Sequence, residues 1–198
     1  MKILIASNNQ HKIIEFQAIF RTFDNIKLLT PKDLNIEIEI EENGNTFEDN
    51  SIIKAKKYFD ISQIPILADD SGLIVPDLNN EPGIYSARYA GIGANDNLNR
   101  QKLLENIKLK GLIEPKAKFI CIICFYDGNN EYIFNGECNG KIINEERGYN
   151  GFGYDPIFVP NSFSLTFAEL DSEIKNKISH RAKALEKFKF FMNEYLKK

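Results

Sequence analysis

The amino-terminal segment constrains the fold most, because a short apolar run passes directly into a helical pattern. Lys2 to Ala6 is typical of a buried strand. After a polar turn, apolar residues recur at helical spacing, at Ile13, Ile14, Phe16, Ile19 and Phe20. A strand that leads at once into a helix is the building unit of α/β proteins, so we predict an α/β fold.

The same alternation continues along the chain. We expect strands at Ile26 to Leu29 and at Ile36 to Ile40, the second with one solvent-exposed face. A helix is expected to begin after Thr46 as its cap. The segment PILADDSGLIV contains two apolar runs that an acidic turn separates, and Asn95 to Leu109 predicts another helix. No repeat or flexible linker is visible, so the 198 residues are predicted to form one domain or two tightly joined lobes.

The second half of the chain is richer in strand signals. From Lys118 to Lys141, two β-branched and aromatic runs flank the turn Asp127-Gly128-Asn129-Asn130, which predicts a hairpin. A glycine-rich loop, GYNGFGYDP, precedes a strand candidate at Ile157 to Val159. Apolar residues at helical spacing then predict that the chain ends in an amphipathic helix.

Charge and cysteine usage exclude several functional classes. The formal net charge is -3, and no run of five or more like charges offers a footprint for nucleic acid. The apolar run after Met1 is too short for a signal peptide or a membrane span, so we expect a cytosolic protein. Three cysteines argue against a disulfide framework, and the Cys121 and Cys124 pair lies in an apolar run, which favours core packing over zinc or redox chemistry.

The loop after the first strand is a candidate phosphate site. Amides at a helix amino terminus carry partial positive charge, and Lys12 adds a full charge. An ordinary polar helix cap is the alternative. The loop consists of Ser7, Asn8, Asn9, Gln10, His11 and Lys12.

Acidic residues cluster at two predicted strand ends. Asp69 and Asp70 follow a buried strand, where ionised carboxylates need a cation or well-placed donors. With Ser71 after them, they form a turn that suits a hard metal ion, and a simply capped turn is the alternative. Glu41 and Glu42 end the earlier strand, and convergence of the two ends would require a divalent cation. The alternative is that Glu41 and Glu42 are ordinary solvated surface residues.

Basic and aromatic residues could complete such a site. Lys54 and Lys175 lie in apolar-flanked segments, although most lysines are solvated. His180 and Arg181 open the final helix and could present donors to a purine edge, with ordinary surface placement as the alternative. Phe152 could stack on a base or belong to the core.

Together these motifs resemble the inosine-triphosphate pyrophosphatase family, also described as the Ham family. SNNQHK is similar to the family's opening Ser/Thr-x-Asn-x-x-Lys loop, with Ser7 where Thr is frequent and Asn8 where Gly is common. The match spans nearly the whole chain and resembles the bacterial branch. The other matching blocks, in the family's order, are EENGNTFEDNSIIKA, ADDSGL, PGIYSARYAG, NGFGYDPIF, TFAEL and ISHRAKAL.

The resemblance implies a fold and an activity. The fold would be an elongated α/β structure over residues 1–198, with a long twisted mixed sheet flanked by helices and two lobes around a substrate cleft, assembled as a homodimer. The activity would be Mg²⁺-dependent hydrolysis of dITP, ITP, XTP and dXTP to monophosphate and pyrophosphate, which removes deaminated purines from the nucleotide pool. The alternatives are a Maf-like pyrophosphatase of modified nucleotides, a catalytically silent nucleotide-binding module, and a protein interaction domain.

The resemblance also implies roles for individual residues. Asp70 would be catalytic, and Glu41 with Asp70 would hold Mg²⁺, aided by Glu42 or Asp69. Phe152 would stack on the purine, and Arg181 would donate to the 6-oxo group, which adenine lacks. The polyphosphate would be bound by Ser7, Asn9, Lys12, Lys54 and Ser71, and the base edge by Asp155, Lys175, His180 and Arg181. The substrate would also contact Asn8, Gln10, His11, Gly153 and Tyr154.

Overall fold

The computed structural model describes residues 1–21, 23 and 25–197, except for the side chain of Ile19. The chain divides into two compact units. Unit 1 comprises Met1–Asp70, Cys121–Gly136 and Arg181–Lys198, and unit 2 comprises Ser71–Ile120 and Glu137–His180. Each unit has a hydrophobic core of its own, so each is described by itself.

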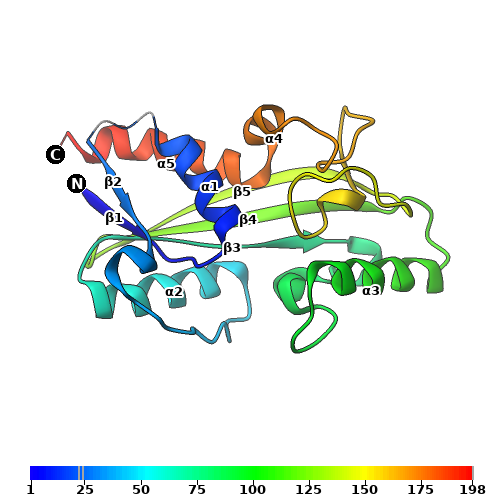
Figure 1. Ribbon diagram of the computed structural model, residues 1–198, viewed down its shortest axis with the longest axis horizontal. Coiled ribbons are helices and arrows are strands. Elements are labelled where there is room, and N and C mark those ends of the chain that lie inside the picture. The colour runs from blue at the N-terminus through cyan, green and yellow to red at the C-terminus, as the bar shows by residue number, and fades with distance from the viewer. Residues whose placement is uncertain (22, 24, 198) are drawn as a thin grey trace. The chain divides into compact units, whose positions relative to one another are not determined.

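The strands form a mixed sheet in the order β2-β1-β3-β4-β5-β6. Strand β1 runs parallel to β2 and β3, and β6 runs antiparallel to β5 (Figure 1). The predicted α/β class, a mixed sheet flanked by helices, is confirmed. The strands are β1 Lys2–Ile5, β2 Lys27–Leu29, β3 Ile66–Ile74, β4 Lys116–Tyr126, β5 Glu131–Ile142 and β6 Phe158–Pro160. The α-helices are α1 Gln10–Phe20, α2 Phe47–Ser62, α3 Asp96–Leu109, α4 Ser172–Ile178 and α5 His180–Tyr195.

In unit 1 the sheet has a core on each face, because successive strand residues point to opposite sides. Ile5 and Leu67 belong to a core with residues of α1 and α5. Leu4 and Ala68 belong to the other core, with residues of α2. Figure 1 shows α1 and α5 on one side of β1 and α2 on the other. In the part of β3 that belongs to unit 1, Ile66 to Asp70, a side chain therefore meets either α1 and α5 or α2, according to its position.

Unit 2 has a third core, built on the other halves of the long strands. Leu73 of β3 and Phe119 of β4 are buried in it together with Phe158 of β6. Helix α3 contributes Leu103 and Ile107, which are both fully buried. Short 3₁₀ helices connect the elements of this unit, namely η2 Pro76–Leu78, η3 Gly83–Arg88 and η4 Asp155–Ile157, and η1 Pro31–Leu34 lies in unit 1.

Two strand predictions were wrong. The acidic turn expected inside PILADDSGLIV is absent, because β3 runs unbroken from Ile66 to Ile74 through Asp69 and Asp70. These carboxylates stay in the strand because charged and polar side chains pair with them in the interior. Residues 36–40 form neither strand nor helix, although the predicted alternation is present, with half-buried isoleucines and exposed glutamates. Those isoleucines pack on the α2 core as an extended segment.

Most helix predictions are confirmed. Thr46 caps α2 in a capping box with Asp49, and Asn95 caps α3. Ile14, expected on the apolar side of α1, is instead 60% exposed, because the buried stripe of this helix runs through Ile13 and Phe16. Each helix in the described part of the chain is too short or too polar to span a bilayer.

The cysteines are core residues, as predicted. Cys121, Cys124 and Cys138 are free and buried. Burial raises the pKa of Cys121 and of Cys124 to about 12, so both stay protonated thiols at neutral pH.

Candidate active site

The loop between β1 and α1 is organised by Asn9, the cap of the helix. Oδ1 of Asn9 accepts hydrogen bonds from the amides of His11 and Lys12, at 3.0 and 3.3 Å. The Asn9 amide donates to Oγ of Ser7 at 3.2 Å. Since Asn9 satisfies two amides of the first turn, a phosphate at this loop would depend more on side chains such as Lys12 than on those amides.

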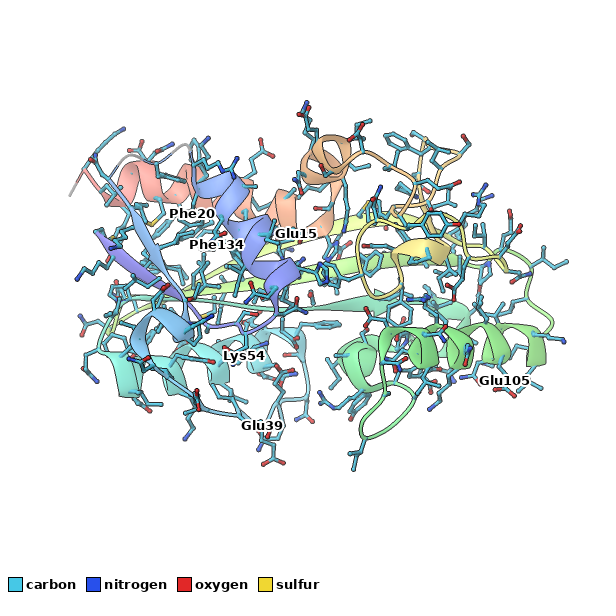
Figure 2. The ribbon with its side chains drawn as sticks, viewed as in Figure 1. Glu15, Phe20, Glu39, Lys54, Glu105 and Phe134 are labelled. Carbon is cyan, nitrogen blue, oxygen red and sulfur yellow. The ribbon has the colours of Figure 1, made fainter. Side chains whose placement is uncertain are left out.

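Asp69 lies on the face of β3 that α1 and α5 cover. Its Oδ2 is 3.0 Å from Nζ of Lys12 and accepts hydrogen bonds from Nη2 and Nε of Arg181, at 2.9 and 3.2 Å. Arg181 also pairs through Nη1 with Glu15, which Figure 2 labels on α1. Burial alone would raise the pKa of Asp69, but the charges of Lys12 and Arg181 outweigh it and hold the pKa well below the usual range. Asp69 is therefore an ionised, cation-bound carboxylate.

Asp70 lies on the opposite face, toward α2. Its Oδ2 accepts a hydrogen bond from Nδ2 of Asn50 at 3.0 Å, and its Oδ1 is 3.7 Å from Nζ of Lys54. The same ammonium donates to Oε1 of Glu42 at 2.9 Å, and Figure 2 labels Lys54 on α2. Burial raises the pKa of Asp70, and Glu42 raises it further against the opposing charge of Lys54. Asp70 is thus the more basic of the two neighbours.

These contacts leave an excess of negative charge in unit 1. When every group is ionised, four carboxylates share three cations. The carboxylates are those of Glu15, Glu42, Asp69 and Asp70, and the cations are Lys12, Lys54 and Arg181. On the Asp69 side, Asp69 and Glu15 meet Lys12 and Arg181, and on the Asp70 side, Asp70 and Glu42 both meet Lys54.

Asp70 and Glu42 present carboxylate oxygens, the donor type that Mg²⁺ takes in proteins. Within residues 1–21, 23 and 25–197, no three acidic, histidine or cysteine side chains gather closely enough to hold a metal by themselves. Mg²⁺ commonly takes only one or two carboxylates and fills its remaining positions with water and substrate phosphates. Glu41, the predicted partner of Asp70, is exposed, whereas Glu42 contacts Lys54.

In unit 2, the glycine-rich loop closes around Asp155. Oδ2 of Asp155 accepts a hydrogen bond from the Phe152 amide at 2.9 Å and lies 2.8 Å from Nζ of Lys175. Gly151 has φ +77°, and a Cβ there would lie 2.1 Å from the same oxygen, so only glycine allows this closure. Asp155 and Lys175 are both buried, which makes their ion pair a fixed part of the loop.

The Phe152 ring is half-buried and carries a cation beside it. Nζ of Lys175 lies 5.0 Å from the ring centroid, within the range of a cation–π contact. The loop also lines an open cavity of about 390 Å³ together with Asp96, Arg100 and Glu146. An aromatic face next to a fixed ammonium can hold a planar heterocycle that has a hydrogen-bond acceptor on its edge.

The remaining predicted residues are divided between the two units. His180 in unit 2 stacks on Phe119 at 4.8 Å between ring centroids, whereas the next residue, Arg181, binds Asp69 in unit 1. Tyr154 is buried, and its hydroxyl donates to the Ser86 carbonyl. The Gly153 amide donates to Asp96, and Ser71 is half-buried in β3. Asn8, Gln10 and His11 are exposed at the loop surface.

Sequence reasoning missed two polar residues of unit 1. Asn50 is fully buried between Asp70 and a loop amide, and Glu15 pairs with Arg181. For Asn50, the available signal was a polar residue among the apolar positions of α2. For Glu15, the signal was a carboxylate three residues after Lys12. Both are ordinary helix residues in sequence, because only the packing of α2 against β3 and of α1 against α5 gives them partners.

Comparison with known proteins places the chain in a family. A model described as the Ham1 family matches residues 3–191. The chain belongs to the Ham1 family. The predicted family is therefore confirmed, and the Maf-like alternative is set aside.

Relatives of this Ham1-family chain match it along nearly the whole length. The dITP/XTP pyrophosphatase of Clostridium perfringens is 45% identical over 203 residues, which cover 99% of both chains. That of Nautilia profundicola is 45% identical over 94% of both. The solved HAM1 protein of Coxiella burnetii has a TM-score of 0.90 at 41% identity, with coverage of 98% of this chain and 99% of that one. The nucleoside-triphosphatase / dITP/XTP pyrophosphatase of Mycobacterium abscessus has a TM-score of 0.76 at 36% identity, covering 95% and 97%.

Proposed function

We propose that this chain hydrolyses dITP, ITP, XTP and dXTP to the nucleoside monophosphate and pyrophosphate, with Mg²⁺ as cofactor, and so removes deaminated purines from the nucleotide pool. The observation that carries the proposal is the group formed by Asp70, Glu42 and Lys54 in unit 1. A basic carboxylate, a second carboxylate and a buried lysine provide a proton acceptor, cation ligands and a phosphate contact. The names of the family relatives support the substrate class.

In the proposed reaction, a water oxygen attacks the α-phosphorus and the bond from that phosphorus to the bridging oxygen breaks. Pyrophosphate leaves, and Asp70 accepts the proton of the water. The raised pKa of Asp70, caused first by burial, suits this role. Lys54 and Lys12 would neutralise phosphate charge once the nucleotide competes for them. Bound Mg²⁺, held by Asp70 with Glu41 or Glu42, would supply Lewis acidity and orient the phosphates.

We infer that Lys175 provides the main selection against adenine. A purine stacked on Phe152 would have its edge next to Nζ of Lys175, which Asp155 holds in place. The 6-oxo group of hypoxanthine or xanthine accepts a hydrogen bond from this ammonium, whereas the 6-amino group of adenine cannot. A mismatched buried donor costs about 1–3 kcal/mol, or roughly tenfold per 1.4 kcal/mol.

Arg181 is better suited to holding Asp69 than to reading a base. Its Nε and Nη2 bind Asp69 and its Nη1 binds Glu15, so reading a base would require it to exchange these contacts. The base-reading role predicted for Arg181 stays a prediction, as do those of His180 and Asp155. We propose instead that Arg181 and Lys12 fix Asp69 so that β3 presents Asp70 toward α2.

Product analysis tests the function directly. The purified protein is mixed with dITP, XTP, GTP or ATP in Mg²⁺, and the products are separated by ion-exchange chromatography. We expect pyrophosphate with dIMP or XMP, little use of ATP or GTP, and no turnover in EDTA. Asp70→Asn should lower kcat by about 10²–10⁴-fold, the usual worth of a general base. Asp60→Asn, an exposed carboxylate on the same helix as Lys54, should leave kcat unchanged. Orthophosphate release or equal use of all four nucleotides would reject the proposal.

Three further expectations from the sequence and the resemblance stay predictions. They are the homodimer, the substrate cleft between two lobes and the cytosolic location. Light scattering of the purified protein measures the mass in solution, and twice the 22.7 kDa of the chain would support the dimer.

A further inference from the structure

Asn50 makes a two-sided contact inside unit 1. It lies on α2 and is fully buried. Its Nδ2 donates to Oδ2 of Asp70 at 3.0 Å, and its Oδ1 accepts a hydrogen bond from the Gly44 amide at 2.9 Å. Since an amide N–H can only donate and a carboxylate can only accept, the two partners fix the orientation of the side chain. One amide group thus joins the catalytic carboxylate to a loop.

That loop carries the two glutamates of the proposed cation site. Gly44 follows Glu42 by two residues, so the tether acts next to the acidic pair. A Cβ on Gly44 would lie 2.6 Å from Cβ of Asp49 and 2.7 Å from Oδ1 of Asn50. Any larger residue would therefore push the loop away from α2. The absence of a side chain at residue 44 is what permits the hydrogen bond to Asn50.

We propose that Asn50 is a positioning residue that ties the loop of Glu41 and Glu42 to Asp70. Through this amide, the carboxylates of Glu42 and Asp70 are held in fixed positions around Lys54. One oxygen of Asp70 accepts from Asn50, while the other stays directed at Lys54. The inference deepens the proposed function and rests on it, since it assigns to Asn50 the geometry of that catalytic group.

A buried asparagine can also have a structural role in which it only hydrogen-bonds the backbone, and unit 2 contains such a case. Asn99 on α3 is 2% exposed. Its Oδ1 accepts from the Ala90 amide at 2.8 Å and its Nδ2 donates to the Ala87 carbonyl at 3.1 Å. Both asparagines link a helix to backbone amides, but only Asn50 donates to a carboxylate. Asn99 is therefore a matched control for the loss of a buried amide.

The test compares Asn50→Asp with Asn99→Asp. Each new carboxylate can still accept from the loop amide but cannot donate, and at residue 50 it also faces Asp70. We expect Asn50→Asp to lower kcat on dITP by about 10–100-fold with KM little changed, as for residues that orient a site. Asn99→Asp should leave kcat within about twofold of wild type, because the hydrogen bonds of Asn99 go to the backbone of Ala87 and Ala90. Equal kcat values for the two variants would overturn the proposal.

Hydrogen exchange gives a readout that needs no turnover. Amides of residues 41–45 should exchange faster in Gly44→Ala, where the new Cβ forces the loop away from Asn50, than in wild type, and should be unchanged in Asn99→Asp. If Asn50→Asp fails to fold, Gly44→Ala still breaks the tether from the loop side. Unchanged exchange in Gly44→Ala would contradict the tether. If exchange differs between Gly44→Ala and wild type as expected but the wild type leaves dITP intact, the proposed function is rejected and the tether is not.

Discussion

The two faces of the sheet in unit 1 shift the pKa values of neighbouring aspartates in opposite directions. On the α1 and α5 face, Asp69 binds Lys12 and Arg181, and these cations hold its pKa well below the usual range. On the α2 face, Asp70 shares Lys54 with Glu42, and burial raises its pKa. The two residues differ by one position on a strand, which is enough to send their side chains to opposite sides.

The difference separates stability from reactivity. A carboxylate that binds two cations stabilises the fold in its ionised form and is a poor proton acceptor. A buried carboxylate with too little positive charge around it is costly to ionise and is a better proton acceptor. We propose that β3 supplies both, with stability from Asp69 and reactivity from Asp70.

The largest stability effect is expected at Asp69. Asp69→Asn leaves Lys12 and Arg181 without their shared anion in the interior, which should cost about 3–5 kcal/mol of the free energy of unfolding. Urea unfolding at neutral pH measures it. The control is Glu137→Gln, which removes the partly exposed pair with Lys118 and should cost at most about 1 kcal/mol. If Asp69→Asn also lost at most about 1 kcal/mol of the free energy of unfolding, the proposed difference between the two faces would be contradicted.

In unit 2, the buried ion pair of Asp155 and Lys175 has one carboxylate for one cation, in contrast to Asp70 and Glu42, which share Lys54. Lys175→Met removes the donor beside Phe152, so the preference for ITP over ATP in kcat/KM should fall by about 10–100-fold. Lys177→Met on the same helix is the control, because Lys177 is exposed. Retention of the full preference in Lys175→Met would move base reading to another residue, with Arg181 the first to test.

The smallest expected effect is on the pH dependence of stability. The folded-state pKa of Asp69 is depressed, so its contribution is fully present above the unfolded-state pKa, about 3.9, and is lost as pH falls toward the folded-state pKa. The gap in unfolding free energy between wild type and Asp69→Asn should therefore narrow by about 1 kcal/mol from pH 5 to pH 3. A gap that stays constant or widens in acid would mean that Asp69 is not held ionised by its partners.

The sequence predicted elements whose signals are local. The α2 capping box needs only Thr46 and Asp49, and the hairpin needs only its turn and two apolar runs. Family motifs likewise named Asp70 with Lys54 and Asp155 with Lys175, and the two members of each pair lie in contact in the structure.

Contacts that depend on tertiary packing could not be predicted. The acidic segment of β3 looked like a turn because its carboxylates had no visible partners, and those partners come from α1, α2 and α5. The isoleucines of residues 36–40 alternate like a strand, yet no ladder is formed, since alternation reports a buried face and not hydrogen bonding. Asn50 and Glu15 gained roles only through such packing.

The most direct test measures unfolding and turnover of Asp69→Asn and Asp70→Asn side by side at neutral pH, with turnover expressed per folded molecule. Because the folded-state pKa of Asp70 is raised, ionised Asp70 contributes no stability there, and its replacement should leave the free energy of unfolding equal or higher while abolishing most dITP hydrolysis. Asp69→Asn should lose stability and keep the larger share of turnover. The opposite pattern, with Asp70→Asn unstable but active, would contradict the division of roles across β3.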